Sequence, residues 1–304
     1  MELPRIALGA GNFGGIGSAP AFFGQGQTEA EAFAIMDAAW GLEITHFDTA
    51  DAYGGGRSET AIGRWMRARG QRPTITTKTY NPMAEGADHG LAPDRIRRQL
   101  RSSLERLGVD HVALYLAHEF DPDTPLTDTF EAFEDAQDDG LIGAYGVSNF
   151  DHGQLEQAID SGDPEAIQNG RSLLDRSDDG LLDLCATCGV AYSAFSPLCG
   201  GWLTGRYRRG QPFPPGSRMT QRPEPYSHLE NERTFDALEH LEDVARGRGH
   251  SLAALALAWL LADPRVTQVV IGPSRPEHLE PVREALDNPL TEREREQIEA
   301  LCWS

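Results

Sequence analysis

The chain has 304 residues, 39% of them hydrophobic, which is enough for two small domains or one large α/β barrel. Its formal net charge of −20 argues against nucleic acid and anionic membranes as partners, because both are polyanions. The first residues show no secretory signal pattern, and the longest apolar run, residues 252–262, is about half the length that spans a bilayer. We therefore expect a cytoplasmic protein.

Strand-like and helix-like segments alternate along the chain. The pattern predicts strands at residues 5–10, 44–48, 74–79, 112–116, 143–147, 166–167, 190–195 and 266–271. It predicts helices at residues 28–40, 58–69, 93–107, 127–139, 151–159, 181–188, 232–246, 252–261, 277–286 and 292–301. Eight strand–helix units predict an α/β fold, a closed (β/α)8 or TIM barrel that forms a single domain over residues 1–304.

A glycine pattern after the first predicted strand is similar to a dinucleotide-binding fingerprint. Gly9, Gly11 and Gly14 fit the spacing G-x-G-x-x-G. In a Rossmann fold a helix begins at once, so that its N-terminus meets the pyrophosphate. Here a glycine-rich loop continues to Gln27. The sequence therefore favours a loop that approaches a ligand at the mouth of a barrel.

Two cysteines, Cys185 and Cys188, have the C-x-x-C spacing of redox and zinc sites. No second pair or histidine partner completes a metal site, and the segment reads as an amphipathic helix that ends at Gly189. We expect small buried thiols in a reducing compartment, and no metal.

Polar side chains follow the predicted strands, at the end where α/β barrels carry their chemistry. Asp48 and Tyr53 follow the second strand, Lys78 lies near the end of the third, and His118 follows the fourth. Lys78 is the most informative, because it is the single lysine among 27 lysines and arginines. An ammonium is compact and shifts its pKa on burial, which arginine cannot do. The later strands end in further candidates: Ser148, Asn149, Gln168, Phe195 and Ser196.

Together these residues resemble the aldo-keto reductase superfamily, in particular its bacterial aryl-alcohol-dehydrogenase-like branch. The resemblance covers nearly the whole chain in order. Its motifs are residues 46–54, Ser58-Glu59, Ile62-Gly63, Thr77-Lys78, residues 114–118, 146–150, 196–205 and 269–272. It implies an NAD(P)H-dependent oxidoreductase that reduces aldehydes or ketones to alcohols, reversibly.

The resemblance places a catalytic tetrad on Asp48, Tyr53, Lys78 and His118. Asp48 would hold Lys78 in a buried ion pair, and the ammonium would lower the pKa of Tyr53 from its usual value of about 10. His118 would bind the substrate carbonyl, and Tyr53 would deliver the proton while the nicotinamide delivers the hydride.

The resemblance also implies a set of cofactor contacts. They are Gly11, Asn12, Phe13, Asp48, Ser148, Asn149, Gln168, Phe195, Ser196, Leu198, Gly200, Gly272, Ser274, Arg275 and His278. Arg275 is the candidate for a 2′-phosphate, because a guanidinium offers fixed charge and two donors. We therefore expect NADP rather than NAD. His278 and Arg171 depart from the residues usual at their positions, which leaves this preference open.

Two alternatives accompany the enzyme hypothesis. An NADPH-binding regulatory protein of the same fold, resembling potassium-channel β-subunits, would carry the same tetrad. A metal-dependent hydrolase would need several histidine and carboxylate ligands, which His118 alone does not supply. We expect a small carbonyl or alcohol substrate, no nucleic acid or membrane partner, and a monomer or small homo-oligomer. The aromatic residues of the loop 205–231, with Phe22, Phe23 and Trp202, are expected to shape the substrate pocket.

Overall fold

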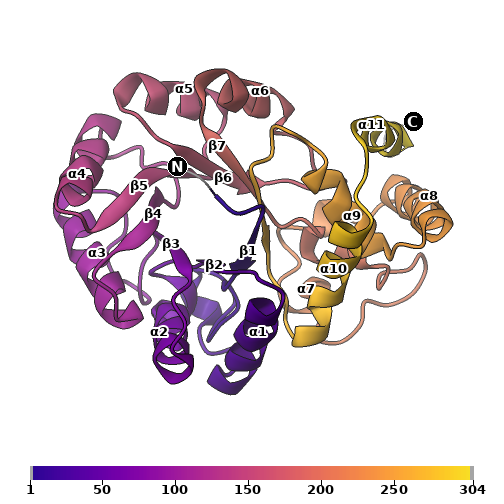
Figure 1. Ribbon diagram of the computed structural model, residues 1–304, viewed down its shortest axis with the longest axis horizontal. Coiled ribbons are helices and arrows are strands. Elements are labelled where there is room, and N and C mark those ends of the chain that lie inside the picture. The colour runs from indigo at the N-terminus through magenta and orange to yellow at the C-terminus, as the bar shows by residue number, and fades with distance from the viewer. Residues whose placement is uncertain (1–2, 302–304) are drawn as a thin grey trace.

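The computed structural model describes residues 3–301. Eight parallel strands pair in chain order, and β1 closes on β8, so the predicted barrel is confirmed (Figure 1). The strands are β1 (Ile6–Gly9), β2 (His46–Asp48), β3 (Thr74–Thr79), β4 (Val112–Ala117), β5 (Ile142–Ser148), β6 (Ala166–Gly170), β7 (Ala191–Phe195) and β8 (Gln268–Ile271). Residues 1, 2 and 302–304 of the predicted domain lie outside the described residues.

Helices surround the barrel on its outside (Figure 1). They are α1 (Glu29–Gly41), α2 (Arg57–Arg69), α3 (Pro93–Leu107), α4 (Leu126–Asp138), α5 (His152–Ser161), α6 (Asp179–Cys188), α7 (Arg218–Gln221), α8 (Glu232–Arg248), α9 (Leu252–Leu261), α10 (Glu280–Asp287) and α11 (Glu292–Leu301). Within residues 3–301, none of them is long and apolar enough to cross a membrane.

The predicted elements occur in the predicted order, and most boundaries shift by one to three residues. The second strand begins at His46 rather than at residue 44, because Glu43 takes a left-handed φ of 60° and the chain turns there. The predicted helix 277–286 divides into a 3-10 turn, η5 (Pro276–Leu279), and α10. Pro281 lies in the first turn of α10, where its missing N–H has no helical partner to lose.

The first βα loop explains why the glycine pattern is not a Rossmann fingerprint. After β1 the chain folds back on itself, with Gln27 N donating to Asn12 O at 2.8 Å and Gly14 N donating to Gln27 O at 2.9 Å. The helix α1 begins only at Glu29, where Thr28 and Glu31 form a capping box. The loop therefore covers the barrel mouth instead of opening a helix onto a phosphate.

The barrel interior has its own small apolar core. Leu114, Leu116, Ala144 and Ala166 form a cluster separate from the main core between strands and helices. Lys78 is the register partner of Leu116, and register partners on paired strands face the same side of the sheet. The lysine therefore projects into the barrel.

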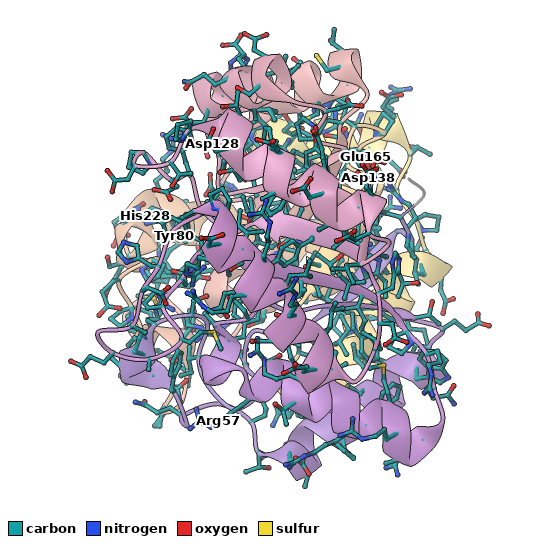
Figure 2. All side chains as sticks on the ribbon, turned by 90° about the vertical axis from the view of Figure 1, so that its left-hand side faces the viewer. Arg57, Tyr80, Asp128, Asp138, Glu165 and His228 are labelled. Atoms are coloured by element: carbon teal, nitrogen blue, oxygen red, sulfur yellow. The ribbon has the colours of Figure 1, made fainter. Side chains whose placement is uncertain are left out.

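A side view separates the two ends of the barrel (Figure 2). Tyr80, which follows β3, and His228, in the loop after β7, lie toward one end. Asp138 and Glu165, which precede β5 and β6, lie toward the other. The first end is the mouth formed by the carboxyl ends of the strands, where the polar candidates were predicted.

The C-x-x-C pair lies in α6, which ends at Gly189 as predicted. Cys185 is buried, and burial raises the pKa of its thiol to about 12. Cys188 is exposed, so the prediction of two buried thiols is wrong for this residue. It lies on the outer face of the helix, three residues from Cys185.

Candidate active site

An ion pair between Lys78 and Asp48 forms the base of the site. Lys78 lies on β3 with 0% of its surface exposed. Its Nζ donates to Asp48 Oδ1 at 2.6 Å and to Thr49 O at 2.8 Å. Asp48 ends β2, so two adjacent strands supply the pair. The predicted pairing of the two side chains is present.

A glycine turn presents Tyr53 above this pair. Tyr53 begins the 3-10 turn η2 (Tyr53–Gly55), and Gly54, Gly55 and Gly56 all have positive φ, between 59° and 85°. Lys78 Nζ lies 5.2 Å from the centre of the Tyr53 ring. The ring of Tyr53 is partly exposed, and a Cβ at Gly11 would lie 3.6 Å from it. The first loop therefore lies directly against the tyrosine, at a distance where even a Cβ would make only an ordinary van der Waals contact.

The pKa of Tyr53 shifts in the direction opposite to the one expected. Burial raises the pKa of the phenol above 10.0, while the nearby ammonium of Lys78 opposes this rise without reversing it. The prediction of a lowered pKa is therefore wrong in this structure, because desolvation outweighs the attraction. Burial also disfavours the charge of Lys78, but Asp48 and Tyr53 outweigh that effect and raise its pKa. Lys78 stays an ammonium and Tyr53 stays a protonated acid.

His118 follows β4 and lies beside the tyrosine. The two ring centres are 5.5 Å apart in a T-shaped arrangement. His118 is buried, its Nδ1 has no hydrogen-bond partner, and burial together with the charge of Lys78 lowers its pKa well below 6.5. The imidazole is therefore neutral and can donate one hydrogen bond. The structure brings all four residues of the predicted tetrad to one place.

Three predicted cofactor residues lie at the ends of β5 and β6. Gln168 Nε2 donates to Asp48 Oδ2 at 2.7 Å, which connects it to the Lys78 pair. Ser148 Oγ donates to Gln168 O at 2.7 Å, and Asn149 Nδ2 donates to His118 O at 2.9 Å. A network of side-chain hydrogen bonds thus crosses the mouth from β2 to β6.

Backbone strain gathers at the same segments. Among residues 3–301, four residues other than glycine have positive φ, and three of them are Asn149, Ser196 and Cys199. Such conformations cost about 1–3 kcal/mol each and cluster at ligand sites. A pocket of about 390 Å³ beside them is lined in part by Asn149, Phe195, Ser196 and Tyr226. Phe195 and Ser196 are partly exposed there, as a ligand contact requires.

In the loop after β7, the segment predicted to bind the pyrophosphate packs very closely against Tyr226. Gly200 has φ 63°, and a Cβ there would lie 2.6 Å from the Tyr226 ring, so only glycine fits. Tyr226 OH lies 3.1 Å from Ser196 Oγ. Leu198 and Gly200 are partly exposed on this loop. The aromatic residues Trp202, Tyr207, Phe213 and Phe235 instead pack on one another, with Trp202 fully buried, so Trp202 and Phe213 do not shape the pocket as expected.

A cationic group lies after β8, where the adenosine phosphate was predicted. Arg275 Nε donates to His278 Nε2 at 2.9 Å, and Ser274 Oγ lies 3.1 Å from His278 Nδ1. Burial lowers the pKa of His278, and the charges of Arg275 and Arg206 lower it further. Gly272 is exposed, with nothing within 4 Å of a Cβ placed on it.

Two arginines at the mouth were missed by the sequence analysis. Arg206 stands close enough to His278 to influence it, and Arg218 Nη2 donates to Asn12 Oδ1 at 2.9 Å. Arg206 lies in the irregular loop after β7, and Arg218 begins the four-residue helix α7, which is too short for periodicity to mark. In contrast, Phe13 was predicted as a cofactor contact, but its side chain is buried in the main core.

These residues fit a nicotinamide dinucleotide. The mouth offers a partly exposed aromatic ring, amide side chains and a neutral histidine at one end, and arginines with exposed glycine backbone at the other. Diphosphate and ribose phosphate need such cations, and a nicotinamide ring needs such a surface. Within residues 3–301, no group of histidine, cysteine or carboxylate side chains is placed to hold a metal ion.

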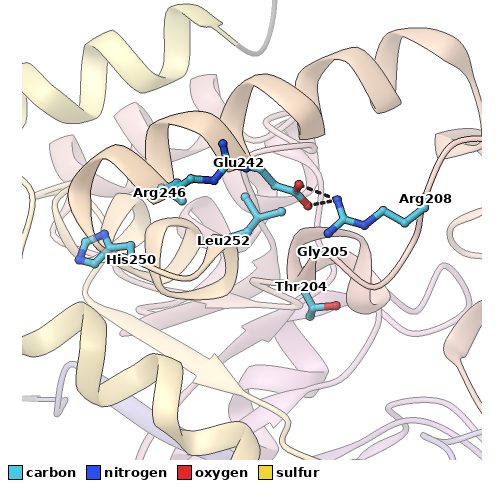
Figure 3. A pocket seen from close by; sticks show the side chains of 8 residues that line it. Thr204, Gly205, Arg208, Glu242, Arg246, His250 and Leu252 are labelled. Atoms are coloured by element: carbon cyan, nitrogen blue, oxygen red, sulfur yellow. Dashed lines mark hydrogen bonds and ion pairs between the residues drawn. The ribbon is translucent and has the colours of Figure 1, made fainter.

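A second hollow, of about 300 Å³, lies away from the tetrad (Figure 3). It is lined by residues of α8, the start of α9 and the segment before Arg208, and it contains none of the predicted site residues. Arg208 Nη1 donates to both oxygens of Glu242 at 2.5 Å, which ties its two walls together. The chemistry therefore gathers at the strand ends and not in this hollow.

Comparisons with known proteins agree with this geometry. A family model described as "Aldo/keto reductase family" matches residues 5–302. The chain is 34% identical to L-glyceraldehyde 3-phosphate reductase of Escherichia coli, over 95% of this chain and 85% of that protein. It is 31% identical to a probable voltage-gated potassium channel subunit beta of rice, over 87% and 84%. It superposes on the glycerol dehydrogenase structure from Gluconobacter oxydans with a TM-score of 0.84 and 26% identity, covering 98% and 91%.

Proposed function

The chain belongs to the aldo/keto reductase family of oxidoreductases, and from its site we propose that it reduces aldehydes or ketones to alcohols with a nicotinamide cofactor, reversibly. One observation carries the proposal. A fully buried ammonium, Lys78, paired with Asp48, lies under a partly exposed phenol and beside a neutral imidazole. This is an arrangement for giving a proton to an oxygen atom.

The bound nicotinamide would supply the hydride to the carbonyl carbon. The neutral imidazole of His118 donates a hydrogen bond to the carbonyl oxygen and orients it. Tyr53 gives its proton to the oxygen as negative charge develops there, which makes the alcohol. The ammonium of Lys78 stabilises the phenolate that remains, and Asp48 keeps that ammonium in place.

We propose NADPH as the preferred cofactor. The support is the group formed by Arg206, Ser274, Arg275 and His278, since a 2′-phosphate carries the charge and oxygen acceptors that guanidinium and hydroxyl groups bind. Arg218 adds a cation beside Asn12. NADH lacks the 2′-phosphate and would leave this group without its ligand.

The test is a titration of tryptophan fluorescence with NADPH and NADH, followed by a screen of aldehydes and ketones that monitors oxidation of the cofactor. We expect tighter binding of NADPH and turnover of at least some aldehydes. Tyr53→Phe removes only the acidic hydroxyl, so turnover should fall by about 10²–10⁴ while cofactor binding is kept. Turnover that survives this change would refute the assigned proton donor.

The relationship to a probable potassium channel subunit favours a second candidate, a regulatory protein that binds NADPH. The complete tetrad is compatible with both functions. Binding of NADPH without turnover of any carbonyl compound in the screen would favour regulation over catalysis.

A further inference from the structure

We propose that Glu119 makes this site select carbonyl substrates that carry a positive charge, such as amino-aldehydes, and reject anionic ones. The inference rests on the proposed function and adds the substrate class to it. Glu119 has no part in the proton transfer described above, and its carboxylate is a separate feature of the mouth.

The position of Glu119 places its charge next to the reacting groups. It directly follows His118 at the end of β4 and is partly exposed. Its Oε1 accepts from Asn149 Nδ2 at 3.3 Å, the same amide that donates to His118 O. It is also near enough to Tyr53 that its charge raises the pKa of the phenol. A substrate that reaches Tyr53 and His118 therefore passes beside this carboxylate.

No cation of the described chain neutralises Glu119. Within residues 3–301 it forms no ion pair, and burial alone accounts for the rise of its pKa to about 7. The nearby cation, Lys78, is already paired with Asp48, and His118 is neutral. The Glu119 carboxylate is thus partly desolvated, and no oppositely charged side chain among residues 3–301 pairs with it.

On this side of the mouth carboxylates outnumber cations. Burial raises the pKa of Tyr80, which lies beyond β3, and the charges of Asp121, Glu119 and Asp123 raise it further. Arg95 is a cation near Tyr80 as well and opposes this rise; its guanidinium donates to Thr79 Oγ1 and to two backbone carbonyls, and its Nε lies 4.0 Å from Asp88 Oδ2. Three carboxylates and one guanidinium act on Tyr80, so the field on this side of the mouth is negative. It attracts an ammonium group and repels a phosphate or carboxylate.

Three para-substituted benzaldehydes of different charge test the proposal: 4-(trimethylammonio)benzaldehyde, its neutral isostere 4-tert-butylbenzaldehyde, and the anion 4-carboxybenzaldehyde. Their kcat/KM is measured with saturating NADPH at about pH 8, where Glu119 is ionised. Each value is divided by that of Glu119→Gln, because this ratio cancels the intrinsic reactivity of the aldehyde. We expect the ratio for the cation to exceed that for the neutral compound about tenfold, and the ratio for the anion to fall below it.

Glu131→Gln is the matched control, because it removes one charge from the exposed side of α4. It should leave all three values within about twofold. Equal ratios for the three aldehydes would overturn the proposal. If the neutral aldehyde is not reduced by the unaltered protein, and no other carbonyl is, the proposed function fails instead.

A measurement on the unaltered protein covers the case in which Glu119→Gln does not fold. Raising the salt from about 0.05 M to about 0.5 M should reduce the preference for the cation over the neutral aldehyde at least twofold, because salt screens a partly exposed charge. A preference that is absent, or that salt does not change, would refute the role of this carboxylate.

Discussion

Replacing Lys78 with arginine tests whether the site requires an ammonium or only a positive charge. Lys78 is fully buried; its Nζ donates to Asp48 Oδ1 at 2.6 Å and to Thr49 O at 2.8 Å, and it also interacts with the Tyr53 hydroxyl. A guanidinium carries five N–H donors in a rigid fork. These acceptors can satisfy only part of this fork, which leaves buried N–H donors without partners.

These contacts set the expected losses of stability and of turnover. Overpacking a filled interior costs about 1–3 kcal/mol, and each buried donor left without a partner costs about 1–3 kcal/mol more. We expect Lys78→Arg to lower the free energy of unfolding by about 2–5 kcal/mol. A shift of Tyr53 by about 1 Å would lower turnover about 10²-fold, and loss of support for its phenolate would lower it further.

The assay combines urea unfolding, NADPH binding by fluorescence and steady-state reduction of an aldehyde. Lys78→Met is the matched control, since it keeps the length of the stem and removes the charge. We expect both variants to lose at least about 100-fold in kcat/KM while still binding NADPH. If Lys78→Arg keeps kcat/KM within about threefold of that of the unaltered protein, the reasoning is refuted, because charge alone would then be enough.

Two further predictions concern the cofactor and pH. Arg275→Ala should weaken NADPH binding by about 10–100-fold, the effect of one charge-assisted hydrogen bond, and change NADH binding less than about threefold; equal losses for both cofactors in fluorescence titrations would contradict the phosphate assignment. His46 is fully buried, accepts from Gln268 on Nδ1 and contacts Thr76 on Nε2, and its pKa is lowered from 6.5 to about 4, chiefly by burial. Between pH 6.5 and about 4 the unfolded chain therefore takes up a proton that the folded chain does not, so stability is complete above pH 6.5 and falls by about 3 kcal/mol toward pH 4. Urea unfolding at several pH values should show a shallower fall for His46→Gln, and parallel curves would contradict this assignment.

The tetrad could be predicted from the sequence because parallel strands bring all their carboxyl ends to one mouth. Residues that end β2, β3 and β4 must then lie together, whatever the details of the loops. Lys78 had an additional signal, since the chain otherwise uses arginine for every cation. The order of strands and helices followed from apolar periodicity, which is the strongest local signal a sequence carries.

The parts that could not be predicted depend on loops and on packing. Arg206 and Arg218 reach the mouth from the irregular segment after β7, and in a chain rich in arginine nothing in the local pattern distinguishes them. Phe13 follows the same motif as Gly11 and Asn12, but its side chain packs in the main core instead of facing the mouth. The pKa of Tyr53 depends on how completely the folded chain buries the phenol, which no motif records.

Because the pKa of Tyr53 is raised, the role proposed for Lys78 becomes more specific than the one the sequence suggested. A phenol whose pKa stays above 10.0 holds its proton at neutral pH, and so it is ready to donate in the reductive direction. The ammonium is needed at the next moment, when the proton has left and a buried phenolate has formed. Asp48 already pairs with Lys78 through Oδ1 while Gln168 occupies Oδ2, so the pair is neutral before the reaction and can respond to the new charge without moving. In the proposed mechanism the lysine therefore acts mainly on the product of proton transfer, and this is the step that a displaced guanidinium would fail to support.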